Sequence, residues 1–140
     1  MKNFKHITPI QIRFKDTDMM GHVNNANHLT YIELARLKYF DDVLQGARNW
    51  KNGPGLILAR IEIDYRKPIL IRDNISVGTR CSKIGTKSVQ LDWEIENDNN
   101  GKTEPVAQGI AVVVYFDYEK NQTIPIPEEH RKLLTAFEGL

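Results

Sequence analysis

ANHLTYIELARLKYFDDVLQ, from Ala26 to Gln45, is a long run that contains neither glycine nor proline. Such an unbroken run predicts one α-helix. Either Asn24 or Asn25 can cap its start, since a short amide oxygen accepts hydrogen bonds from the first N–H groups, and Gly46 is suited to end it. Its apolar residues include Leu29, Ile32, Ala35, Leu37, Phe40, Val43 and Leu44. They cover much of the circumference, which predicts a largely enclosed helix.

Alternation of apolar and polar residues on both sides of this helix predicts β-strands. One strand is expected before the helix, over 4–14, with Ile10, Ile12 and Phe14 in alternation. Four strands are expected after it, at 56–66, 74–84, 88–97 and 106–118. In the first of these four, one face is expected to carry Ile57, Ala59, Ile61, Ile63 and Tyr65.

The links between these segments are short and polar. Residues 48–55 read as a loop and 97–104 as a hairpin connection, and a short helix is expected at 128–137. Consecutive strands with short links favour an antiparallel sheet. Because one long apolar helix must be covered, we expect a single α+β domain, residues 1–140, with the sheet wrapped around that central helix.

Composition narrows the classes of function. Of the 140 residues, 41% are hydrophobic, and 19 basic residues against 18 acidic ones give a net charge of +1. This balance argues against a general nucleic-acid-binding protein. Cys81 is the only cysteine, so no internal disulfide can form. The chain shows no secretory signal and no apolar run of about 20 residues that would span a membrane. A cytoplasmic protein is expected.

A polar loop, DTDMMGHVNN from Asp16 to Asn25, precedes the helix. With its flanks, from Arg13 to Arg36, it resembles the 4-hydroxybenzoyl-CoA thioesterase-like branch of the hotdog superfamily. The matching positions are Phe14, Asp16, Asp18, Gly21, His22, Val23, Asn24, Asn25, Glu33, Ala35 and Arg36. The resemblance implies a hotdog fold and hydrolysis of acyl-CoA thioesters. Plastid acyl-carrier-protein thioesterases carry a related loop, so an acyl-carrier protein is an equally open carrier.

The resemblance also implies roles for the loop residues. Asp18 would be the nucleophile or general base, and the backbone N–H of Asn25 would polarise the thioester carbonyl. Gly21 would let the backbone pass close to the substrate, His22 would orient the loop or a water, and Asn24 would contact substrate or cap the helix. The competing structural interpretation is a turn held by local hydrogen bonds. We retain that interpretation for Asp16, and no G-x-S-x-G motif for a serine nucleophile is present.

Glu33 and His28, both in the predicted helix, leave alternatives open for the catalytic acid and for the acyl group. Glu33 is the alternative catalytic acid, because another branch of the superfamily places its acid about two turns inside the helix; its structural interpretation is an ion pair with Arg36. Many relatives have tyrosine or another aromatic residue where this chain has His28, so His28 bears on the choice of acyl group. It could equally be a packing or surface histidine. The histidine spacing does not predict a metal site, and no cofactor is expected beyond the CoA of the substrate.

The phosphates of CoA call for cationic side chains. The turn KIGTKSVQ, from Lys83 to Gln90, resembles the one that meets the CoA nucleotide, with Lys87 and Ser88 as the best matches. Arg60 and Lys67 are weaker candidates. A merely solvated basic turn is the alternative for each of these residues.

The resemblance further implies a homodimer or homotetramer, with Asp18 from one subunit and the 56–66 strand from the other. Two other functions stay open at this point. One is a hydratase or dehydratase acting on acyl thioesters, although the loop lacks the Asp-x-Asn-x-x-His pattern of such enzymes. The other is a non-catalytic acyl-CoA-binding module.

Overall fold

The computed structural model describes residues 1, 3–45 and 53–140. The predicted helix stop at Gly46 and most of the predicted 48–55 loop therefore lie outside the described residues. The elements are β1 (His6–Ile10), η1 (Phe14–Asp16), α1 (Asn25–Val43), β2 (Gly55–Tyr65), β3 (Ile75–Ile84), β4 (Ser88–Asn99), β5 (Lys102–Asp117), β6 (Gln122–Thr123) and α2 (Glu128–Glu138).

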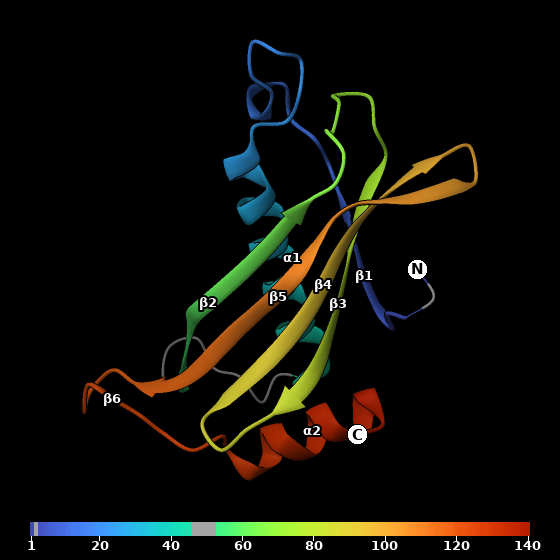
Figure 1. The fold of residues 1–140 in the computed structure, drawn as a ribbon. Helices are drawn as coiled ribbons and strands as arrows, with labels where there is room; N and C mark the ends of the chain where they lie inside the picture. The colour runs from blue at the N-terminus through green and yellow to red at the C-terminus, as the bar shows by residue number, and fades with distance from the viewer. Residues whose placement is uncertain (2, 46–52) are drawn as a thin grey trace.

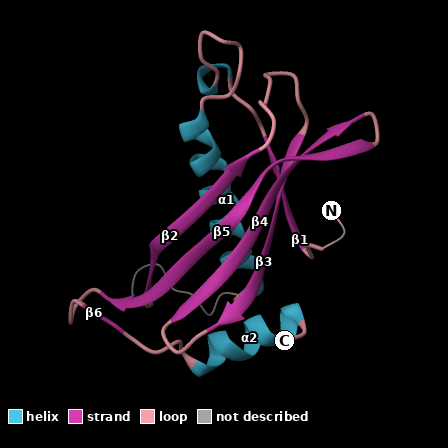
Figure 2. Ribbon diagram, viewed as in Figure 1, coloured by secondary structure: helices cyan, strands magenta, loops and turns pink. Residues whose placement is uncertain are grey.

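One antiparallel sheet, with strand order β1-β3-β4-β5-β2, forms the body of the molecule. Helix α1 runs along one face of this sheet, and α2 lies across its lower end (Figure 1). The short β6 pairs with the end of β5. The predicted α+β architecture, an antiparallel sheet around one long helix, is confirmed (Figure 2).

The core lies between α1 and the sheet. The helix contributes His28, Tyr31, Ile32, Ala35, Tyr39, Phe40 and Val43 to it. The opposite face of the helix is open, with Leu29 and Leu34 each more than 40% exposed. The expectation of a largely enclosed helix was therefore wrong for the single chain, because the sheet covers α1 from one side only.

The first strand is shorter than predicted. It ends at Ile10, and Phe14, expected in the strand, begins the 3₁₀ turn η1 and is 86% exposed. The reason is local: the Asp16 carboxylate accepts a hydrogen bond from the backbone N–H of Arg13 at 3.0 Å and bends the chain. Asp residues commonly favour turns in this way.

A register shift between Leu58 and Arg60 interrupts the pairing of β2 with β5. Such a bulge reverses which alternate side chains face the core. Leu56 packs on the core before the shift, and Ile61 and Ile63 pack on it afterwards. The predicted single apolar face running from Ile57 to Tyr65 was therefore wrong.

Candidate active site

Asp16 connects the 16–25 loop to helix α1 through hydrogen bonds. Its carboxylate, 1% exposed, accepts a hydrogen bond from the Tyr31 hydroxyl at 2.7 Å and forms an ion pair with Arg13 at 3.0 Å. Its backbone oxygen accepts from the backbone N–H of Asn24 and from the side-chain amide of Asn27. Burial by itself would raise the pKa of Asp16, but the hydrogen bonds from Tyr31 and Arg13 outweigh it and lower that pKa. Its structural role was predicted.

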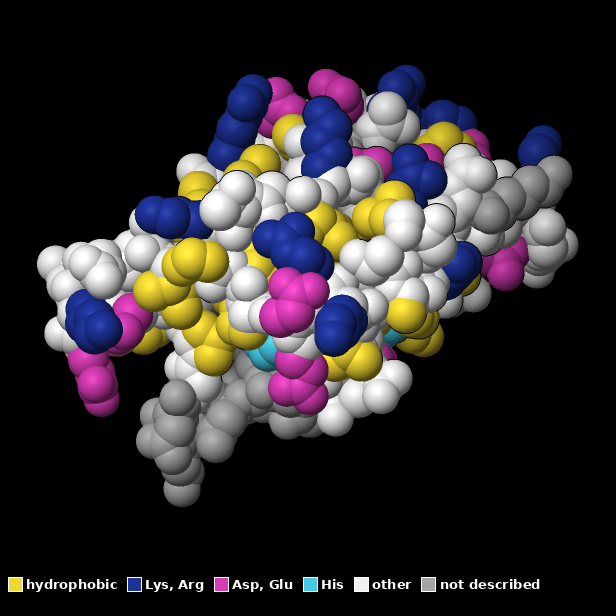
Figure 3. All heavy atoms as spheres, turned by 90° about the horizontal axis from the view of Figure 1, so that it is seen from below, with side chains coloured by type: hydrophobic (Ala, Val, Ile, Leu, Met, Phe, Trp, Pro, Cys, Tyr) yellow, Lys and Arg dark blue, Asp and Glu magenta, His cyan; other side chains and the backbone are white. Residues whose placement is uncertain are grey.

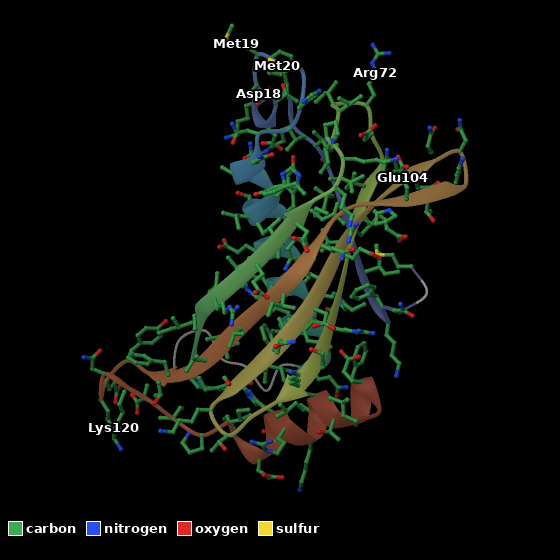
Figure 4. The ribbon with its side chains drawn as sticks, in the orientation of Figure 1. Asp18, Met19, Met20, Arg72, Glu104 and Lys120 are labelled. Carbon is green, nitrogen blue, oxygen red and sulfur yellow. The ribbon has the colours of Figure 1, made fainter. Side chains whose placement is uncertain are left out.

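Asp18 lies on a tight turn at the end of the molecule. The Asp18 Oδ1 accepts from the backbone N–H of Met20 at 2.9 Å, and the Asp18 carbonyl accepts from Gly21 N–H at 3.0 Å. Gly21 has a φ of +78°, which L side chains rarely adopt. Met19 and Met20 form the exposed outer tip of the loop, and Asp18 lies beneath them, toward α1 (Figure 4). The turn leaves the carboxylate accessible.

The start of α1 supplies an uncommitted hydrogen-bond donor. Asn24 is the N-cap, and its Oδ1 accepts from the backbone N–H of Ala26 at 2.9 Å. The Asn24 carbonyl accepts from Asn27 N–H at 2.8 Å. Within residues 1, 3–45 and 53–140, the backbone N–H of Asn25 has no acceptor. Helix starts leave such donors open, and the helix dipole makes the region attractive to negative charge.

These groups open into one cleft of about 280 Å³. It is lined by Asp18, Met20, His22, Val23, Asn24, Asn25 and Pro68. Val23 N–H donates to the Ile69 carbonyl at 2.7 Å, and His22 forms an isolated antiparallel β-bridge with Leu70. The chain after β2 therefore forms the opposite wall of the cleft. Sequence reasoning did not anticipate Pro68, since nothing local marks the 67–70 segment as a neighbour of the loop.

Glu33 lies elsewhere. It lines a separate groove beside Leu34 and Leu37, on the open face of α1, and its side chain is 66% exposed. The Arg36 guanidinium approaches its carboxylate at 4.0 Å, as predicted for the ion pair. The structure therefore does not bring Glu33 and Asp18 together within one chain.

His28 is enclosed rather than at the surface. It is 2% exposed and lies edge-to-face against Tyr65, with ring centroids 4.9 Å apart. Burial lowers the pKa of His28, partly offset by the nearby carbonyls of Asn24 and Asn25. Among the residues described, neither ring nitrogen has a hydrogen-bond partner of acceptable geometry.

The basic residues predicted for the carrier are dispersed. Lys87 and Ser88 lie at the β3–β4 turn, at the opposite end of the sheet from Asp18 (Figure 1). Figure 3 views this lower end and shows Lys and Arg side chains scattered among Asp, Glu and hydrophobic ones. Arg60 is ion-paired with Glu62, and Lys67 with Glu104. A single chain thus does not join Lys87 to the Asp18 cleft.

The remaining candidate features are the single cysteine, a metal site and a membrane-spanning helix. Cys81 is buried, as predicted, and burial raises the pKa of its thiol to about 12. The described part of the chain contains no cluster of three or more His, Cys, Asp or Glu side chains placed to hold a metal ion. Neither described helix combines the length and apolarity needed to cross a membrane.

An antiparallel sheet packed on one long helix, with Asp18 and the start of that helix lining one cleft, is the hotdog arrangement. A thioesterase from Thermus thermophilus, crystallised with coenzyme A and zinc, is 34% identical and superimposes with a TM-score of 0.83, covering 100% of this chain and 98% of that one. The 4-hydroxybenzoyl-CoA thioesterase in complex with 4-hydroxybenzoyl-CoA is only 18% identical, with a TM-score of 0.82 over 91% of this chain and 96% of that one. That second likeness shows the fold alone.

Sequence comparison identifies the family. Long-chain acyl-CoA thioesterase FadM of Escherichia coli (strain K12) is 25% identical over 129 residues, which cover 91% of this chain and 95% of FadM. The model of the Thioesterase-like superfamily matches residues 12–134. The chain belongs to the Thioesterase-like superfamily, and it is a thioester hydrolase by class.

Proposed function

We propose that the protein hydrolyses acyl-CoA thioesters, with Asp18 as nucleophile or general base. One observation carries the proposal: Asp18 lines the same cleft as Asn25, whose backbone N–H has no acceptor among the described residues. The names of FadM and of the two thioesterases of known structure support CoA as the carrier. An acyl-carrier-protein thioester is the alternative carrier.

The proposed chemistry needs one carboxylate and one hydrogen-bond donor. The Asp18 carboxylate either attacks the thioester carbonyl or removes a proton from a water that attacks it. The negative charge that develops on the carbonyl oxygen is stabilised by the Asn25 N–H and by the positive end of the α1 dipole. The C–S bond then breaks and the CoA thiolate leaves. In the nucleophilic route, water hydrolyses the resulting anhydride and restores Asp18.

Lys87 is the best of the predicted carrier-binding cations. Arg60 and Lys67 already have carboxylate partners, at 2.7 Å and 2.5 Å, which offset their charges. Among the described residues, the Lys87 ammonium forms no ion pair and donates one hydrogen bond, to the neutral Thr123 hydroxyl at 3.4 Å. Its charge is therefore available to a phosphate.

The open edge of strand β2 supports a homodimer or homotetramer. Within the described part of the chain, strand β2 pairs only with β5, so its other edge is open, and open edges favour pairing. If two β2 edges pair antiparallel about a two-fold axis, the lower end of one chain lies beside the upper end of its partner. Lys87 of the partner subunit would then approach the Asp18 loop, which no single chain allows.

The first test is hydrolysis of a panel of acyl-CoAs, followed with a thiol reagent, by the wild type and by Asp18→Asn. We expect Asp18→Asn to fold normally and to lose about 10²–10⁴ in kcat, the usual contribution of a general base. Glu33→Gln tests the alternative acid, and Glu129→Gln, an exposed carboxylate on α2, serves as the matched control.

Near-wild-type rates for Asp18→Asn together with a large loss in Glu33→Gln would move the chemistry to Glu33. Tight acyl-CoA binding by calorimetry without thiol release would instead indicate a binding module. Loss of enoyl-CoA absorbance, again without thiol release, would indicate a hydratase.

A further inference from the structure

The turn between β3 and β4, which carries Lys87, is held by residues from the C-terminal part of the chain. The Arg131 guanidinium, near the start of α2, donates from Nη2 to the Gly85 carbonyl at 2.8 Å. The backbone N–H of Ile126 donates to the Thr86 carbonyl at 2.9 Å. The turn and α2 meet at the lower end of the sheet (Figure 1). The position of Lys87 therefore depends on a segment far away in the sequence.

This turn lacks the hydrogen bond that often closes a β-turn. In a closed turn, the carbonyl of the first residue accepts from the backbone N–H of the fourth. Within the described residues, the Gly85 N–H donates to the Ser88 carbonyl at 2.8 Å, but the Ser88 N–H does not donate to the Gly85 carbonyl. That carbonyl accepts from Arg131 instead. Arg131 thus supplies a contact that the turn does not make for itself.

The packing of α2 gives Arg131 a fixed place beside the turn. The neighbouring His130 is 3% exposed, and its Nδ1 is hydrogen-bonded to the Tyr115 hydroxyl at 2.9 Å. Tyr115 also donates its backbone N–H to the Lys87 carbonyl at 2.9 Å. Among the described residues, no carboxylate forms an ion pair with Arg131. The rigid guanidinium is therefore free to hold the Gly85 carbonyl.

We propose that Arg131 is a positioning residue of the carrier site, which holds the open 85–88 turn so that Lys87 is presented to the phosphates of CoA. A cation that is already oriented loses less side-chain entropy when it binds a phosphate. The inference rests on the proposed thioesterase function and on Lys87 as its carrier-binding cation. It extends that site to helix α2.

Two thioesters with the same acyl group, butyryl-CoA and butyryl-N-acetylcysteamine, test the inference, because only the first carries phosphates. In Arg131→Met, we expect KM for the CoA thioester to rise about three- to tenfold, the scale of one hydrogen bond, with kcat nearly unchanged. The KM for the N-acetylcysteamine thioester should stay at the wild-type value. Lys132→Met, an exposed neighbour on α2, is the matched control and should change neither KM.

A double-mutant cycle shows whether Arg131 acts through Lys87. If it does, adding Arg131→Met to Lys87→Ala should raise KM for the CoA thioester little further, because the cation that the turn positions is already gone. Arg131→Lys, which keeps a cationic donor, should recover most of the wild-type KM. Thermal unfolding followed by circular dichroism checks that each variant folds.

The outcomes separate this inference from the function beneath it. An unchanged KM in Arg131→Met would overturn the role of Arg131, as would an equal rise for both thioesters, which would indicate a general disturbance of the fold. Effects of Arg131→Met and Lys87→Ala that multiply in the double variant would show that Arg131 acts independently of Lys87. Failure of the wild type to hydrolyse any thioester would overturn the proposed function itself.

Discussion

At the scale of single residues, the two aspartates of the loop have opposite environments. Asp16 is 1% exposed and is held by Tyr31 and Arg13, whereas Asp18 is exposed and its carboxylate is bonded within its own turn. The buried carboxylate fixes where the loop begins, and the exposed one is left to react. Substituting each in turn should therefore change different properties.

We predict that Asp16→Asn lowers the free energy of unfolding by about 1–3 kcal/mol, because the variant weakens the hydrogen bonds that the buried carboxylate accepts from Tyr31 and Arg13. The measurement is urea unfolding followed by circular dichroism. Asp18→Asn is the matched control, an identical chemical change two residues away, and should leave the free energy of unfolding unchanged. Equal stability of the Asp16 variant and the wild type would show that the network does not hold the loop.

At the scale of the elements, β5 approaches its neighbours so closely at Gly109 that no side chain fits there. A Cβ atom on Gly109 would lie 1.8 Å from the Glu62 carbonyl oxygen and 2.8 Å from an atom of the Trp93 ring. The first of these belongs to the backbone of β2, so it cannot move aside without disturbing the strand pairing. The absence of a side chain thus lets Trp93 pack under the β2–β5 pair.

We predict that Gly109→Ala destabilises the protein by about 1–3 kcal/mol, the usual cost of overpacking a core, and lowers its melting temperature. Gly78→Ala is the control, because its Cβ would meet side-chain atoms of Phe4 and Met1, which can move. Calorimetric melting of both variants makes the comparison. A smaller loss for Gly109→Ala than for Gly78→Ala would contradict the strand geometry described above.

At the scale of the whole molecule, the candidate residues lie at two ends of one sheet. The Asp18 cleft is at the upper end, and the Lys87 turn is at the lower end, with the length of β3 between them (Figure 1). A strand of 10 residues spans roughly 33 Å, too far for one chain to bring both groups to the same phosphates and thioester. A shared site would need two chains.

We predict that mixing two defective variants restores activity. Asp18→Asn should be nearly inactive, and Lys87→Glu should have a raised KM for acyl-CoA. Refolded together as a two-fold dimer, half the molecules would be mixed, each with one intact site, giving about a quarter of the wild-type rate. The assay is thiol release at low acyl-CoA, with sedimentation to establish the oligomeric state. Activity no higher than the average of the separate variants would place Lys87 outside the partner's site.

Much of the site could be predicted from the sequence because its interactions are local. The Asn24 cap, the turn after Asp18 and the positive φ of Gly21 all depend on residues within a few positions of one another. The long central helix followed from an unbroken run of residues for the same reason. Local hydrogen bonds and backbone preferences act before any distant segment is in place.

Three other features depend on packing between distant segments. The bulge in β2, the burial of His28 beneath Tyr65 and the separation of Lys87 from Asp18 depend on segments that are far apart in the chain. Alternation within one strand cannot reveal a register shift that its partner strand defines. A polar residue on a helix likewise carries no local sign of which side chain will cover it, because burial is a property of the packed whole.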